Sequence, residues 1–91
     1  MKKSVHALVS GQVQGVGFRY YVHRSARRCN LTGWVRNVEE GRVEIMAEGE
    51  ERDLDSFLIE VRKGSRWSTV DDVQTEWADY EKKFRSFEIT G

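Results

Sequence analysis

GQVQGVGFR, residues 11–19, joins two segments with different hydrophobic periods. Before it, Val5, Ala7 and Val9 alternate with other residues in a mostly apolar run, which is typical of a buried strand that ends at Gly11. After it, apolar and small residues recur at helical spacing, which predicts a helix that begins at Phe18 and stops at Asn30. The apolar stripe of this helix consists of Phe18, Val22, Ser25, Ala26 and Cys29.

Downstream of this helix the sequence predicts a hairpin and a second helix. Segments 31–38 and 42–48 are strand-like, and Glu39-Glu40-Gly41 separates them, so we expect a hairpin in which Gly41 takes a positive φ. A second helical stripe follows and stops before Gly64, a residue that suits a helix C-terminus. This stripe consists of Leu54, Phe57, Leu58 and Val61.

Two further strand-like segments follow, at residues 73–77 and 84–89. The complete order is therefore β-α-β-β-α-β-β. This order packs two helices on one face of a mainly antiparallel sheet. We therefore predict an α+β fold, a ferredoxin-like α/β sandwich with a βαββαβ core and an extra strand, in one domain of residues 1–91.

Composition excludes several protein classes. Hydrophobic residues make up 38% and charged residues 33% of the chain, and ten residues are aromatic, which favours a packed globule over a disordered chain. The one cysteine, Cys29, cannot form an internal disulfide, which favours a reducing compartment. No apolar run is long enough for a signal-peptide core or a membrane span, so we expect a cytoplasmic protein with no membrane contact.

Charge is balanced over the chain but unevenly distributed along it. The formal net charge is zero, which gives no indication of nucleic-acid binding. Residues 1–37 nevertheless contain seven basic and no acidic residues, whereas residues 38–91 contain eight basic and fifteen acidic residues. This asymmetry is consistent with an anion site in the first third, and equally with a basic helix face opposite acidic strands.

The glycine-rich turn has the features of an anion site. Gly15 and Gly17 allow several N–H groups to converge at the start of a helix, and such a concave nest binds phosphate or carboxylate. Arg19, in the first helical turn, can add two parallel N–H donors. A tight strand-to-helix turn with Arg19 on the surface remains the alternative. Walker A and dinucleotide-binding loops are excluded, because the first needs Gly-Lys-Ser/Thr and the second a glycine where Tyr20 stands.

Asn37, just before the predicted hairpin turn, is the second candidate. A carboxamide can hold a water through both a donor and an acceptor, although it cannot act as a base, and an asparagine here can also be purely structural. His23 could be a base or a phosphate ligand, but its arginine-rich helix favours a solvated surface position. We expect His6 to pack on the first strand and Cys29 to be buried rather than nucleophilic. Core or sheet positions are available to Tyr20, Tyr21 and the tryptophans, and we assign them no site role.

Together these segments resemble the acylphosphatase family. Val9 to Arg19 reproduces the family's first motif, and Gly33-Trp34-Val35-Arg36-Asn37, followed by Gly41-Arg42-Val43 and Gly49, reproduces the second. The Phe87-Glu88-Ile89 ending is also similar, so the resemblance covers nearly all of the chain. Two departures are the proline-free segment 64–69 and the Thr90-Gly91 ending, where many members have prolines and a larger residue.

The resemblance implies an enzyme that hydrolyses the carboxyl–phosphate bond of a small acyl phosphate. It implies that Arg19 binds the phosphate oxygens, that Asn37 positions the attacking water, and that backbone N–H groups hold the phosphate. Those N–H groups belong to Gly15, Val16, Gly17, Phe18 and Arg19. We expect no metal, no cofactor and no nucleic-acid partner, a monomer, and inorganic phosphate as both product and inhibitor. The alternative is a non-catalytic anion-binding regulatory domain of the same fold.

Overall fold

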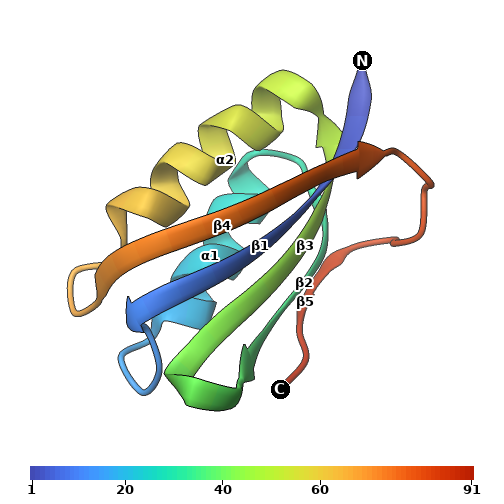
Figure 1. Cartoon of the computed structure of the whole chain (residues 1–91). Coiled ribbons are helices and arrows are strands. Elements are labelled where there is room, and N and C mark those ends of the chain that lie inside the picture. Colours follow the sequence, from blue (N-terminus) through green and yellow to red (C-terminus); the bar gives the residue numbers. More distant parts are fainter.

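In the computed structural model, which describes residues 1–91, two helices cover one face of a five-stranded sheet (Figure 1). The elements follow one another in the predicted order, so the ferredoxin-like fold with an extra strand is confirmed. Their bounds are β1 Lys2–Gln12, α1 Phe18–Arg28, β2 Thr32–Val38, the short 3₁₀ turn η1 Glu39–Gly41, β3 Arg42–Glu50, α2 Glu51–Lys63, β4 Thr69–Asp79 and β5 Phe87–Ile89.

The strands lie in the order β4-β1-β3-β2-β5. β1 pairs with β3 on one side and with β4 on the other, and all pairs among the first four strands are antiparallel. β5 is the extra strand, and it runs parallel to β2 with Val35 opposite Ile89. This pairing brings the last residues of the chain alongside β2 (Figure 1).

The core lies between the sheet and the helices. Alternate residues of β1 and β3 face the helices, as predicted, and the apolar stripes of α1 and α2 cover them. Cys29 is half-buried at the end of α1. Burial raises the pKa of its thiol, and the negative charge of Asp53 raises this pKa further, so the thiol is a poor nucleophile at neutral pH.

A buried carboxylate fixes the connection that leads to β5. Glu48 points from β3 into this connection, and its two oxygens accept hydrogen bonds from the N–H groups of Glu81 and Lys83, each at 3.0 Å. Because both carboxylate oxygens are occupied, burial of this group does not leave its acceptors unpaired. Glu48 thereby helps to determine where β5 begins.

The structure differs from the prediction at the ends of several strands and in the exposure of two aromatic residues. β1 and β4 extend beyond the predicted segments, while β5 is shorter than residues 84–89. The expectation of core or sheet positions is wrong for Tyr20 and Trp67, whose exposed fractions are 68% and 70%.

Neither α1 nor α2 has the length and apolar content that a membrane-crossing helix needs.

Candidate functional site

The turn between β1 and α1, residues 13–17, is anchored at both ends and bends at its glycines. Val13 and Phe18 are buried in the core on either side of the bend. Gly15 and Gly17 have φ values of 72° and 76°, and a Cβ at either position would meet no atom within 4 Å. The left-handed backbone, rather than lack of space, therefore favours glycine at both positions.

Backbone N–H groups in and after this turn have no acceptor in the protein backbone. None of the residues from Gly15 to Arg19 donates a backbone–backbone hydrogen bond, and the first helical bond runs from Tyr21 N–H to Gly17 O at 3.1 Å. The positive end of the α1 dipole lies here, and the first turn contains no acidic residue. The local electrostatics therefore favour an anion.

Gln14 connects this turn to the β2–β3 hairpin. Its side-chain Nε2 donates hydrogen bonds to Val38 O at 2.9 Å and to Arg42 O at 2.8 Å, one at each side of η1. Sequence reasoning missed this residue. The only available signal was a carboxamide directly before Gly15, which offers two donors to neighbouring carbonyl groups.

Arg19 and Asn37, the two predicted catalytic side chains, belong to residues that contact the same oxygen atom. Arg19 donates from Nη1 to the backbone oxygen of Gly91, and the backbone N–H of Asn37 donates to that oxygen at 3.3 Å. The segment after β5 is held there by a hydrogen bond from Thr90 N–H to Val35 O at 3.0 Å. The structure thus brings Arg19 and Asn37 together around one acceptor.

The side chain of Asn37 has an unused acceptor. Its Oδ1 atom is buried and has no hydrogen-bond partner. An unpaired buried acceptor costs about 1–3 kcal/mol. A water or ligand hydroxyl that donates to this oxygen would remove the penalty, so the Asn37 side chain has a free hydrogen-bonding position.

A cavity of about 150 Å³ lies against the turn. Among the predicted binding residues, Gly15, Gly17, Phe18 and Arg19 line it, and Ile89 of β5 contributes to its wall. Val16 and Asn37 do not line this cavity. Val16 instead packs against the core, and Asn37 is connected to the cavity through the oxygen that it shares with Arg19.

The other candidate residues lie elsewhere. His23 packs between Tyr20 and Phe87, with ring centroids 6.5 and 6.1 Å away, and does not line the cavity at the turn. Cys29, at the far end of α1, does not line it either. No cluster of three or more His, Cys, Asp or Glu residues is arranged to hold a metal ion.

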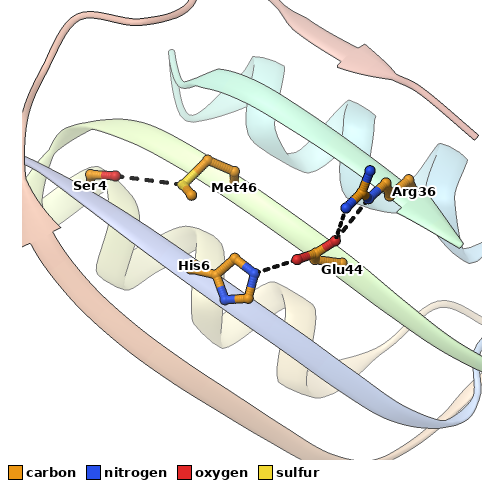
Figure 2. Close-up of polar contacts among 5 residues, drawn as sticks. All are labelled: Ser4, His6, Arg36, Glu44 and Met46. Atoms are coloured by element: carbon orange, nitrogen blue, oxygen red, sulfur yellow. Dashed lines mark hydrogen bonds and ion pairs between the residues drawn. The ribbon is translucent and has the colours of Figure 1, made fainter. Parts of the chain in front are cut away.

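His6 lies on the face of the sheet away from the helices, where it belongs to a charged cluster (Figure 2). Its Nε2 atom is 2.6 Å from one oxygen of Glu44, and Arg36 Nε donates to the other oxygen at 2.8 Å. The hydrogen bond from His6, followed by the bond and charge of Arg36, holds the pKa of the Glu44 carboxyl below its ordinary value. This cluster includes no residue of the turn.

Comparisons with known proteins agree with this arrangement. A model of the acylphosphatase family matches residues 5–89. The acylphosphatase of Caldanaerobacter subterraneus subsp. tengcongensis is 39% identical over 89 residues, 98% of this chain and 99% of its own length. That of Bacillus licheniformis is 49% identical over 83 residues, 91% and 92% of the two chains. The crystal structure of acylphosphatase from Bacillus subtilis has a TM-score of 0.94 at 42% identity, over the full length of both chains. The chain therefore belongs to the acylphosphatase family.

Proposed function

We propose that this protein hydrolyses small acyl phosphates to a carboxylate and inorganic phosphate, with Arg19 and Asn37 as its catalytic residues. The observation that carries the proposal is the shared acceptor. Arg19 and the backbone of Asn37 both donate to one oxygen, directly after a turn with unpaired N–H groups. The Gly91 backbone oxygen is an acceptor of the kind that a phosphoryl oxygen supplies when substrate takes that position.

We assign phosphate binding to the turn between β1 and α1. The N–H groups of residues 15–19 donate to the phosphoryl oxygens, and the positive end of the α1 dipole adds to their attraction. The Arg19 guanidinium can donate hydrogen bonds to two phosphoryl oxygens at once, because its N–H groups lie in one plane. These groups neutralise the charge that spreads over the phosphoryl oxygens in the transition state.

The attacking water is oriented by Asn37. Its free Oδ1 accepts a hydrogen bond from the water, whose lone pair then points at phosphorus. A bond forms between the water oxygen and phosphorus, the bond from phosphorus to the acyl oxygen breaks, and the carboxylate leaves with the electron pair. Its conjugate acid has a pKa of about 4, so it needs no proton from the enzyme. The proton lost by the water passes to a phosphoryl oxygen.

This division of roles requires no metal ion. Arg19 and the N–H groups occupy the place that a cation takes in metal-dependent phosphoryl transfer. Hydrolysis of benzoyl phosphate by the purified protein should therefore proceed at an unchanged rate after exhaustive treatment with EDTA. Loss of activity that magnesium or zinc restores would contradict the metal-free mechanism, and phosphate binding without any turnover would contradict the hydrolase.

The proposal also includes the domain organisation, the oligomeric state and the location of the protein. We assign one domain to residues 1–91 and a monomeric state, supported by a core that the chain builds from its own helices and sheet. A cytoplasmic location is supported by the single unpaired cysteine, because a thiol persists in a reducing compartment.

A further inference from the structure

A second cavity, of about 440 Å³, follows the outer side of α1. It is lined by Tyr20, His23, Arg24, Arg27 and Arg28, and we call it the α1 groove. Tyr20 also lines the cavity at the turn, so the two cavities share one wall. The α1 groove therefore begins where the proposed phosphate site ends.

Two cations in the α1 groove have no partner. Arg28 forms an ion pair with Glu60 at 3.6 Å, whereas neither Arg24 nor Arg27 has a carboxylate oxygen within 4 Å. The first 37 residues contain no acidic side chain that could neutralise them. The α1 groove thus retains two positive charges, those of Arg24 and Arg27, that no ion pair of the protein neutralises.

Helix stability explains the positions of only some of the residues that line the α1 groove. Arg27 and Arg28 lie in the last turn of α1, where positive charge is favoured by the helix dipole. That explanation does not extend to Arg24, which lies in the middle of the helix. Nor does it extend to Tyr20, whose ring is 68% exposed and stacks on His23 instead of entering the core. The fold therefore supplies no ion-pair partner for Arg24 and no core contact for Tyr20, and both side chains are free to contact a ligand.

The spacing along α1 suits a substrate that extends out of the turn. A helix rises about 1.5 Å per residue, so Arg24 lies about 7.5 Å and Arg27 about 12 Å along the axis from Arg19. An acyl phosphate whose phosphate occupies the turn must direct its acyl half out of the 150 Å³ cavity. Past Tyr20 and His23, the first arginine along the α1 groove is Arg24.

We propose that the α1 groove is a subsite for an anionic group on the acyl half of the substrate, with Arg24 and Arg27 as the specificity-determining residues. This inference rests on the proposed function and narrows its substrate class to acyl phosphates with a second negative charge. Because the arginines are exposed, each contact should change KM by about three- to fivefold. The preference should weaken with added salt, since the Debye length falls from about 30 Å at 0.01 M to about 10 Å at 0.1 M.

The test compares two benzoyl phosphates whose substituents opposite the acyl phosphate group differ only in charge. They are 4-carboxybenzoyl phosphate and 4-carbamoylbenzoyl phosphate, with benzoyl phosphate as the reference. We expect wild-type protein at low salt to have a lower KM for the carboxylate, and Arg24→Gln and Arg27→Gln to raise that KM three- to fivefold more than the KM for the carboxamide. The kcat values should change much less than KM. The matched control is Arg62→Gln, which removes an equally exposed arginine from the last turn of α2.

Four results separate the possibilities. Equal KM ratios in wild type, Arg24→Gln and Arg27→Gln, with turnover intact, would overturn the subsite but leave the hydrolase standing. An equal effect of Arg62→Gln would also overturn it, because the cause would then be overall charge. Turnover of none of the three substrates would instead overturn the proposed function. Salt-dependent binding of a single-stranded oligonucleotide that is lost in Arg24→Gln would assign the groove to nucleic acid and refute the subsite.

Discussion

Arg19 contributes a donor geometry that a simple positive charge cannot replace. Its guanidinium already reaches an oxygen acceptor beside Asn37. A lysine amine has the charge but lacks the planar pair of donors. Arg19→Lys should therefore raise the inhibition constant of inorganic phosphate and lower kcat by about 10²–10³-fold. Near-native steady-state kinetics of the folded variant on benzoyl phosphate would show that charge alone is sufficient.

Asn37 should affect the water and not the phosphate. Asn37→Ala should lower kcat by about 10²-fold or more, while the inhibition constant of phosphate changes little. The variant should be no less stable than wild type, because Asn37 Oδ1 makes no hydrogen bond that the substitution could remove. Kinetics and thermal unfolding on the same sample test both statements. A folded Asn37→Ala protein with unchanged kcat would show that another group orients the water.

At the scale of elements, the sheet has an acid-sensitive contact on its open face. Glu44 on β3 accepts hydrogen bonds from His6 on β1 and from Arg36 on β2, so one carboxylate joins three strands (Figure 2). Because its pKa is lowered in the folded state, the contribution is complete above the ordinary value of 4.5 and is lost as pH falls through the lowered value. We estimate this contribution at about 1 kcal/mol.

Urea unfolding of wild type and Glu44→Gln measures that contribution. The difference in unfolding free energy should be about 1 kcal/mol at pH 7 and should shrink towards zero at pH 3. Glu39→Gln is the control, since Glu39 is exposed and its side chain forms no ion pair. A difference between wild type and Glu44→Gln that is equal at both pH values would refute the linkage.

Sequence reasoning located elements with a strong local pattern and missed contacts that join distant residues. It placed the start of α1 at Phe18 and the end of α2 before Gly64, because apolar stripes and a glycine mark these points. β4 extends from Thr69 because its pairing with β1 continues through charged residues that interrupt any apolar alternation. The parallel alignment of β5 with β2 has no local signal at all.

The candidate site was likewise predictable only where its residues belong to one local motif. The turn and Arg19 carry a compact local motif, so their proximity follows from the sequence. The hydrogen bond of Gln14 with Val38 spans 24 positions and that of Arg19 with Gly91 spans 72, and no short pattern encodes either. The exposure of Tyr20 was not predicted either, because residue type alone made a core or sheet position available to an aromatic side chain.

For the whole molecule, a ligand of the turn should act as a stabiliser. Anions that bind only the folded chain raise its stability by mass action, by about 2.7 kcal/mol at 100 times Kd. For a domain of this size, 1 kcal/mol corresponds to about 4–8 °C in Tm. Phosphate should therefore raise Tm in a concentration-dependent way and inhibit benzoyl phosphate hydrolysis competitively. Chloride at equal ionic strength is the control, and no response to phosphate would remove the turn as its site.

The double pairing of β1 determines how the molecule opens. Lys2 to Val9 pair with β3 and Lys3 to Gln12 pair with β4, so releasing this strand breaks two ladders at once. Its amides should exchange with deuterium only when the entire chain unfolds, whereas those of the three-residue β5 should exchange through local fraying. The turn from Val13 continues directly from β1, the strand that we expect to exchange most slowly. Its donors are consequently held in place before any anion arrives, and little ordering entropy is lost on capture.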